Sequence, residues 1–203
     1  MKEILFTGSG VAIVTPFHAG AVNFPAFGRL IDRQIDGGTD AIIVCGTTGE
    51  AATMTQKERM ETIAYCVDRV AGRVPVIAGT GANDTQVARE NALAAERLGV
   101  DGLLIVTPYY NKSTQEGLVA HYTEIAEKTT LPIVVYNVPS RTGVNIQPVA
   151  FLVIKDGCVR TIQLSDTSNT IDRALTMLPE LVDKLAALIK RDEKAPEAAP
   201  VEK

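Results

Sequence analysis

Cysteine and histidine are scarce in this 203-residue sequence, which limits the sites that it can build. Its three cysteines, Cys45, Cys66 and Cys158, are odd in number, far apart and without a CxxC pair. This spacing favours buried, reduced thiols over a disulfide framework or a zinc site. The two histidines are His18 and His121, too few for a metal centre built on histidine. We therefore predict a cytoplasmic protein with no metal and no other cofactor.

Long apolar runs and an excess of basic residues are also absent. No apolar stretch approaches the ~20 residues that span a bilayer, and the opening MKEILFTGSG lacks the apolar core of a signal peptide. The formal net charge is −4 and the pI is near 5.3, whereas a general nucleic-acid binder needs a basic face. We therefore expect neither a membrane nor a nucleic acid as partner. Hydrophobic residues make up 46% of the chain, enough for a globular protein with a sizeable core.

Short runs rich in β-branched residues alternate with longer segments of helical period. Within the runs, apolar residues mostly occupy consecutive positions, which is typical of strands buried on both faces in a parallel sheet. The predicted strands are residues 11–17, 41–45, 74–78, 102–106, 131–137 and 159–164. Between them, side chains that can satisfy free amides mark the starts of helices. The predicted caps are Thr55 with Glu58, Ser113 with Glu116, and Asn83 or Asp84.

The predicted strands recur about every 30 residues, which is the length of one βα unit. Six such units fit, whereas a closed (β/α)₈ barrel needs eight strands and typically ~250 residues. We therefore predict an incomplete TIM-type barrel of parallel strands over residues 1–169. A helix over 170–190, kinked or divided at Pro179, and a disordered tail over 191–203 complete the expected organisation.

Polar side chains follow the predicted strands at the edge where parallel α/β folds carry their chemistry. Thr47 and Thr48 lie in a GTTG turn whose amides and hydroxyls can hold a carboxylate or an oxyanion, or can merely cap the turn. Tyr110 and Tyr136 offer phenols for proton transfer, or pack with satisfied hydroxyls. Arg141 can clamp a carboxylate, or be a solvated loop residue. These alternatives remain open at the level of single residues.

Taken together, five ordered motifs resemble the dihydrodipicolinate synthase family of pyruvate-dependent Schiff-base aldolases. The resemblance covers residues 1 to about 146 almost without a break. The motifs are GVAIVTPF at 10–17, GTDAIIVCGTTGEAATMT at 38–55, GRVPVIAGTGANDT at 72–85, GVDGLLIVTPYYNKSTQEGL at 99–118 and PIVVYNVPSRTGVNI at 132–146.

The resemblance implies a (β/α)₈ barrel and a carbon–oxygen lyase that condenses pyruvate with aspartate semialdehyde in lysine and diaminopimelate biosynthesis. It also implies a homo-oligomer. By motif position, Thr47 and Tyr136 resemble the proton-relay residues, and Thr48 resembles the residue that holds the pyruvate carboxylate. Tyr110 resembles the second relay tyrosine, which this family lends across a dimer interface. Arg141 matches the arginine that meets the carboxylate of the second substrate.

The sequence departs from the family at the lysine that forms the imine with pyruvate. The family's sixth strand ends in a segment like I-K-D/E-[AT]-S-G-N, and the best ungapped match here places Ser165 at the lysine position. A shift by one residue places Leu164 there. Neither side chain can form an imine, because only a primary amine can supply its nitrogen. Lys155 in FLVIKD is the alternative amine. Lys112 is a poor substitute, because many relatives that have the imine lysine also have a lysine at this position.

Three functions remain to be weighed. We predict a lysine-less relative that keeps the carboxylate pocket but has lost imine catalysis, so that it binds keto acids, associates with an intact paralogue or is a gene remnant. The first alternative is an active lyase that uses Lys155. The second is an unrelated α/β binding domain. Because the chain ends before the family's seventh and eighth strands, the first and sixth strands are expected to be the edges of the sheet.

Overall fold

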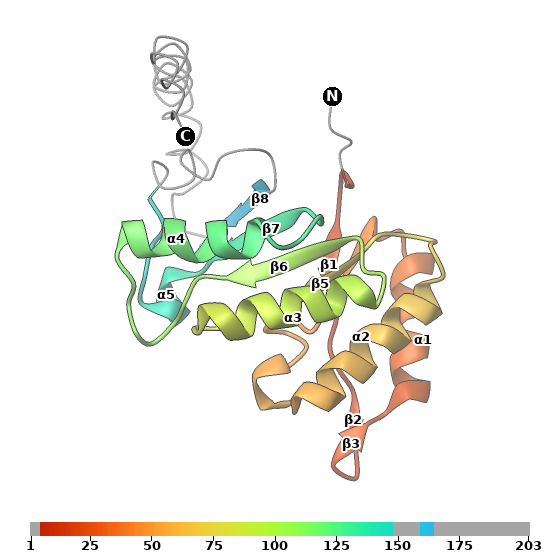
Figure 1. Ribbon diagram of the computed structural model, residues 1–203. Helices are drawn as coiled ribbons and strands as arrows, with labels where there is room; N and C mark the ends of the chain where they lie inside the picture. The colour runs from red at the N-terminus through yellow and green to blue at the C-terminus, as the bar shows by residue number, and fades with distance from the viewer. Residues whose placement is uncertain (1–4, 148–158, 165–203) are drawn as a thin grey trace, which may run out of the picture. The chain divides into compact units, whose positions relative to one another are not determined.

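The computed structural model describes residues 5–147 and 159–164. Six described strands form one parallel sheet in the order β1-β4-β5-β6-β7-β8, so the order along the sheet is the order along the chain (Figure 1). This is the arrangement of an incomplete TIM-type barrel and confirms the predicted fold class. The strands are β1 (Gly10–Ala12), β4 (Ala41–Val44), β5 (Val76–Gly79), β6 (Gly102–Val106), β7 (Ile133–Asn137) and β8 (Val159–Leu164).

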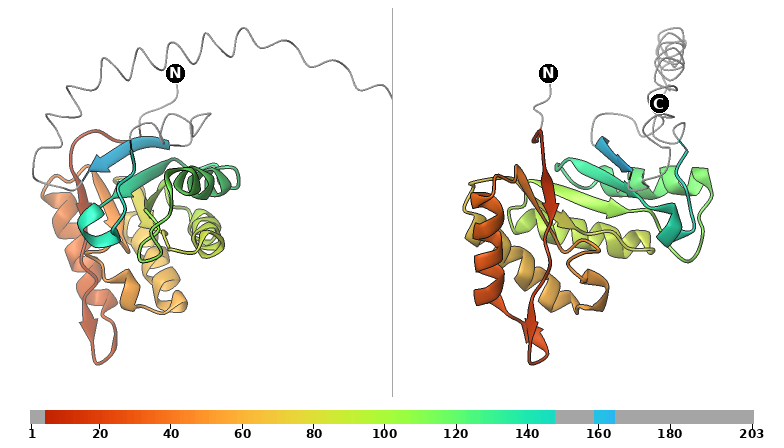
Figure 2. Two further views of the ribbon diagram at one scale, coloured as in Figure 1. Left: turned by 90° about the vertical axis from the view of Figure 1, so that its left-hand side faces the viewer. Right: turned by 180° about the vertical axis from the view of Figure 1, so that it is seen from behind.

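Helices connect the first five strands of the sheet. They are α1 (Phe24–Asp36), α2 (Gln56–Val70), α3 (Thr85–Arg97) and α4 (Gln115–Ala126). Two short helices, η1 (Ala51–Thr53) and α5 (Pro139–Thr142), follow β4 and β7. Helix α2 packs against β4 and β5, and α3 packs against β6, so the helices form a layer on one face of the sheet (Figures 1 and 2).

Both faces of the sheet are apolar, which explains the consecutive hydrophobic runs. The face toward the helices belongs to the main core, whose largest fully buried side chains include Tyr122, Phe27, Ile31, Ile63 and Ile105. The opposite face forms a second cluster of five buried residues, against which Leu5, Phe6 and Tyr136 pack. Those five are Ala41, Ile43, Ile77, Leu104 and Val134.

The first predicted strand is wrong in extent. A strand was expected over residues 11–17, but β1 ends at Ala12, and Phe17–His18 forms β2, which pairs antiparallel with β3 (Ala21–Val22). Pro16 has no N–H to donate to a ladder. The hydroxyl of Thr15 instead donates to the Gly49 carbonyl at 2.8 Å, which ties this segment to the loop after β4. The other strand predictions hold within one or two residues at their ends.

The helix starts agree with the predicted caps in two of three cases. Thr55 and Glu58 form the predicted capping box of α2, and Asp84 is the member of its pair that caps α3. Helix α4 is capped by Thr114, not by Ser113, so the second predicted capping box is wrong. The Thr114 hydroxyl accepts from the Gly117 amide at 3.2 Å, and the side chain of the next residue, Gln115, forms hydrogen bonds with the loop after α5.

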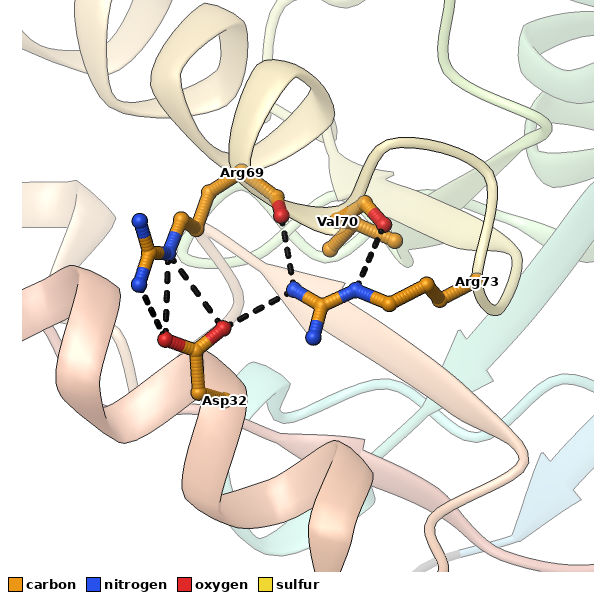
Figure 3. Close-up of polar contacts among 4 residues, drawn as sticks. All are labelled: Asp32, Arg69, Val70 and Arg73. Carbon is orange, nitrogen blue, oxygen red and sulfur yellow. Dashed lines mark hydrogen bonds and ion pairs between the residues drawn. The ribbon is translucent and has the colours of Figure 1, made fainter.

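An ion-pair cluster joins the outer surfaces of α1 and α2 (Figure 3). The Asp32 carboxylate accepts hydrogen bonds from the guanidinium groups of Arg69 and Arg73. The Arg73 side chain also donates to the Val70 carbonyl at 3.0 Å, which holds it near the end of α2. Hydrogen bonds from the two arginines keep the pKa of Asp32 below its ordinary value. The cluster therefore fastens the first helix pair while the carboxylate is ionised.

Replacement of Asp32 by asparagine is expected to lower Tm at low ionic strength and to have less effect at high salt, because salt screens exposed ion pairs. Asp36→Asn is the matched control, since Asp36 is on the same helix and has no salt bridge among the described residues. Thermal unfolding followed by circular dichroism at two salt concentrations measures the difference. Equal effects of the two substitutions would contradict this role of Asp32.

Several predictions concern parts of the chain outside the described residues. These are the helix over 170–190, the tail over 191–203, Cys158, Lys155 and Ser165. Cys45 and Cys66 are described, and both are buried free thiols as expected. Across residues 5–147 and 159–164, no helix has the length and apolar character needed to cross a membrane.

Candidate active site

A cavity of about 540 Å³ lies at the carboxyl ends of the strands. The loops after β4, β5, β6 and β7 all contribute to its walls. Of the predicted site residues, Thr47, Tyr136 and Arg141 line this cavity together. Thr48 is the neighbour of a lining residue, and Tyr110 is not among the described lining residues.

The turn after β4 presents unused hydrogen-bond donors beside the cavity. The Gly46 and Thr47 carbonyls accept from the Gly49 and Glu50 amides, each at 3.1 Å, and this closes the turn. Among the described residues, the amides and hydroxyls of Thr47 and Thr48 have no hydrogen-bond partner, and both residues are exposed. Several donors in one turn form a binding place for an anion of the size of a carboxylate. This favours the functional interpretation of the GTTG turn over the capping one.

Close backbone packing between β4 and β5 fixes the base of this turn. A Cβ on Gly79 would overlap the Cys45 carbonyl oxygen and lie 2.6 Å from its carbonyl carbon. Cys45 itself has a left-handed backbone with φ 54°, which turns the chain out of the strand. Burial raises the pKa of the Cys45 thiol to about 12, so it stays protonated and is no nucleophile near neutral pH.

Arg59 is a cavity residue that the sequence analysis did not single out. It comes from α2, and its Nη2 donates to the Gly79 carbonyl at 3.1 Å. Its Nε is buried without a hydrogen-bond partner among the described residues, and no acidic side chain there forms a salt bridge with it. A signal was present in the sequence. Arg59 is four residues before Ile63 on the buried stripe of α2, where a charged side chain is unusual.

Hydrogen bonds of amide side chains hold the loop that carries Arg141. Asn137, at the end of β7, is 2% exposed and donates to the Asn145 side chain at 2.8 Å. Its side-chain oxygen accepts from the Ile146 amide at 3.2 Å. Between these contacts, helix α5 leads into Gly143 with φ 72°. Arg141 is thus an exposed cation on a loop held by hydrogen bonds, and no described acidic side chain pairs with it.

The two candidate tyrosines are placed very differently. Tyr136 is half-buried and lines the cavity from β7, on the same sheet face as the second apolar cluster. Tyr110 is 89% exposed and has a left-handed backbone with φ 73°. An exposed aromatic residue on an unfavourable backbone is unusual for a packing role. Of these two candidates, Tyr136 is therefore the one that lines the cavity of its own chain.

Strand β8 lies beside β7 and leads to the position expected for the imine lysine. Tyr136 is in register with Gln163, and Asn137 with Leu164. The strand sequence VRTIQL contains no lysine. Ser165 and Lys155 lie outside the described residues. In the described part of the chain, no group of three His, Cys, Asp or Glu residues could hold a metal ion.

Comparison with known proteins gives the family of the chain. A profile of the dihydrodipicolinate synthetase family matches residues 5–201. The chain belongs to this family. It is 47% identical over 190 residues to 4-hydroxy-tetrahydrodipicolinate synthase from Clostridium tetani, which covers 94% of this chain and 65% of that relative. The chain therefore spans slightly less than two thirds of the length of this dihydrodipicolinate synthase.

Solved structures of dihydrodipicolinate synthases have the same fold. The enzyme from Thermotoga maritima is 43% identical with a TM-score of 0.82, over 88% of this chain and 61% of that one. The chloride-inhibited enzyme from Acinetobacter baumannii, complexed with pyruvate, is 41% identical with a TM-score of 0.79, over 88% and 60%. The resemblance seen in the sequence motifs is thus confirmed at the level of family and fold.

Proposed function

We propose that this chain binds a small 2-keto acid such as pyruvate in the cavity after β4–β7, and that it does so without forming an imine. Two observations carry the proposal: the turn at Thr47 and Thr48 has open donors, and strand β8, which pairs with β7, contains no lysine. The turn supplies what a carboxylate needs, whereas imine formation needs a primary amine. The A. baumannii relative, solved with pyruvate, supports the choice of ligand.

In this proposal, each candidate residue has a separate role. The amides and hydroxyls of Thr47 and Thr48 hold the carboxylate of the keto acid. Tyr136 faces the keto group as a hydrogen-bond donor, and Arg141 attracts the carboxylate of a second substrate or of a longer keto acid. Tyr110, exposed in this chain, serves the cavity of a second copy in a cytoplasmic homo-oligomer.

The family reaction is the condensation of pyruvate with aspartate semialdehyde in lysine and diaminopimelate biosynthesis, and an active lyase is the second candidate function. It needs Lys155 in place of the missing lysine. The order of the chain argues against this, because β8 begins four residues after Lys155 while the cavity lies at the carboxyl ends of the strands. Ser165 directly follows β8, at the end where the family lysine is expected.

Borohydride reduction in the presence of pyruvate separates the two candidates. Intact-mass spectrometry is expected to show no covalent pyruvate adduct on this chain, because a reducible imine is never formed. The full-length T. maritima relative is the positive control for trapping. An adduct on this chain would overturn the proposal in favour of the lyase, and its loss in Lys155→Arg would identify the amine.

Pyruvate binding itself is measured by isothermal titration calorimetry. Thr48→Val is expected to weaken binding about 10-fold, because a hydrogen bond to a charged group contributes about 1.5–3 kcal/mol. Thr53→Val is the matched control. Thr53 is an exposed threonine a few residues along the same loop, and its hydroxyl donates to the Glu50 carbonyl. Absence of pyruvate binding, or equal effects of both substitutions, would contradict the proposed site.

A further inference from the structure

Lys112 lies against the loop that carries Arg141, next to two residues that line the cavity. Its side chain runs over Gly143, with Cγ and Cε at 3.9 Å and 3.4 Å from the place that a Cβ on Gly143 would occupy. Gly143 directly follows Thr142, and both Thr142 and Arg141 line the cavity. The absence of a side chain at Gly143 therefore gives the lysine stem a surface on which to lie.

The loop of Lys112 is fastened to the loop of Arg141 by Gln115. The Gln115 amide nitrogen donates to the Asn145 carbonyl at 3.0 Å, and its oxygen accepts from the Gln147 amide at 2.8 Å. Lys112 has a left-handed backbone with φ 47°, which is unfavourable for a residue with a Cβ. Such strain persists where tertiary contacts determine the conformation, and it is concentrated at ligand sites. The loop of Lys112 and the loop of Arg141 are thus joined by these hydrogen bonds and by the contact of the Lys112 stem with Gly143.

The charges around the cavity are unbalanced in the positive direction. Its charged lining residues among those described are Arg59, Asp84 and Arg141. When Lys112, which packs on Gly143 next to the lining residue Thr142, is included, there are three cations to one anion, although the chain as a whole carries a net charge of −4. Neither Lys112 nor Arg141 forms a salt bridge with a described acidic residue. Both cations are thus available to an anionic ligand.

We propose that Lys112 acts with Arg141 as a second cation at the mouth of the cavity and makes the site selective for ligands that carry two carboxylates. This inference rests on the proposed keto-acid site. One carboxylate occupies the turn at Thr47 and Thr48, and the other lies between Arg141 and Lys112. Arg141 supplies a planar pair of donors, and Lys112 supplies a point charge whose stem is already ordered on Gly143. Lys112 is a specificity-determining residue in this arrangement and takes no part in imine chemistry.

Two keto acids of equal chain length test the proposal. 2-Oxoglutarate and 2-oxopentanoate differ in the distal carboxylate, so the ratio of their Kd values measures recognition of that group. By calorimetry at low salt, the unaltered chain is expected to bind 2-oxoglutarate about 10-fold more tightly. Lys112→Met, which keeps a long apolar stem, is expected to lower this preference about 5-fold and to leave 2-oxopentanoate unaffected. Lys112→Arg is expected to retain the preference.

Lys57→Met is the matched control, because Lys57 is an exposed lysine on α2 that pairs with Glu61 and lies outside the cavity lining. It is expected to leave both affinities unchanged. A merely structural Lys112 would lower Tm in Lys112→Met without changing the ratio of affinities, and that result would overturn the proposal. Absence of 2-oxoglutarate binding would overturn it as well. Pyruvate binding, measured separately, shows whether the proposed keto-acid site stands in either case.

Discussion

Replacement of Gly79 by alanine is expected to lower the free energy of unfolding by about 3 kcal/mol, which is large for the addition of one methyl group. The new Cβ would overlap the carbonyl oxygen of Cys45, a backbone atom that cannot move independently of its strand. Relief requires β4 and β5 to separate at the point where the Cys45–Gly46 peptide enters the donor turn. We therefore expect pyruvate affinity to fall together with stability.

Gly46→Ala is the matched control, since Gly46 lies in the same loop. A Cβ there would make ordinary contacts of 3.7 Å with Leu104 and 3.9 Å with Ile43. Its expected cost is below about 1 kcal/mol, because an alanine is tolerated where the backbone is compatible. Urea denaturation of both variants gives the two free energies. Similar values for Gly79→Ala and Gly46→Ala would show that the close approach of the two strands does not limit the fold.

The second large effect concerns acid stability and the buried histidine of α4. His121 is 3% exposed, and its Nδ1 lies 2.9 Å from the Thr85 hydroxyl. Its Nε2 is buried with no hydrogen-bond partner among the described residues. Burial lowers the pKa of His121 to about 4, and the nearby Asp84 carboxylate opposes this shift only in part. The folded protein therefore holds His121 neutral at pH values where the unfolded chain binds a proton.

The direction of the pH dependence follows from the pKa values of His121 in the folded and the unfolded state. An unfolded histidine titrates near 6.5, so between about pH 6.5 and 4 the unfolded state binds more protons than the folded state. The free energy of unfolding therefore decreases as the pH is lowered through this range. The two pKa values differ by about 2.5 units, so the expected contribution of His121 over this window is about 3 kcal/mol. This stabilising contribution is fully present above pH 6.5 and is lost below pH 4.

Urea denaturation of His121→Gln and the unaltered chain between pH 7 and 4 measures this contribution. The variant is expected to lose less stability as the pH falls, whatever its stability at pH 7, since glutamine does not titrate. His18→Gln is the control, because His18 lies exposed in β2. Carboxylates titrate in the lower part of the window in all three proteins, so their contribution cancels in the difference. Parallel stability profiles for His121→Gln and the unaltered chain would rule out this role of His121.

The candidate site illustrates which residues sequence patterns can and cannot find. Thr47 and Arg141 follow strands, Tyr136 lies near the end of β7, and the topology of a parallel sheet brings all three to one edge. Arg59 and Lys112 come from a helix and from a loop further along the chain. Their places depend on contacts with Gly79 and Gly143, which no local pattern indicates. Conversely, motif position predicted a common role for Tyr110 and Tyr136, but only Tyr136 lines the cavity of its own chain.

The sequence alone determined the alternation of strands and helices, their parallel order and the family, because hydrophobic periodicity and ordered motifs are properties of local stretches. The local signal failed where a tertiary contact outweighed it. Thr15 binds the loop after β4 instead of extending the first strand, and at the start of α4, which Thr114 caps, the Gln115 side chain binds the loop after α5. Only the tertiary structure decided that the hydrogen-bond donors of Thr47 and Thr48 stay without a partner among the described residues, and where the cationic side chains around the cavity lie. The places of Arg59 and Lys112 depend on contacts with residues twenty or more positions away, and packing, not periodicity, brings such residues together.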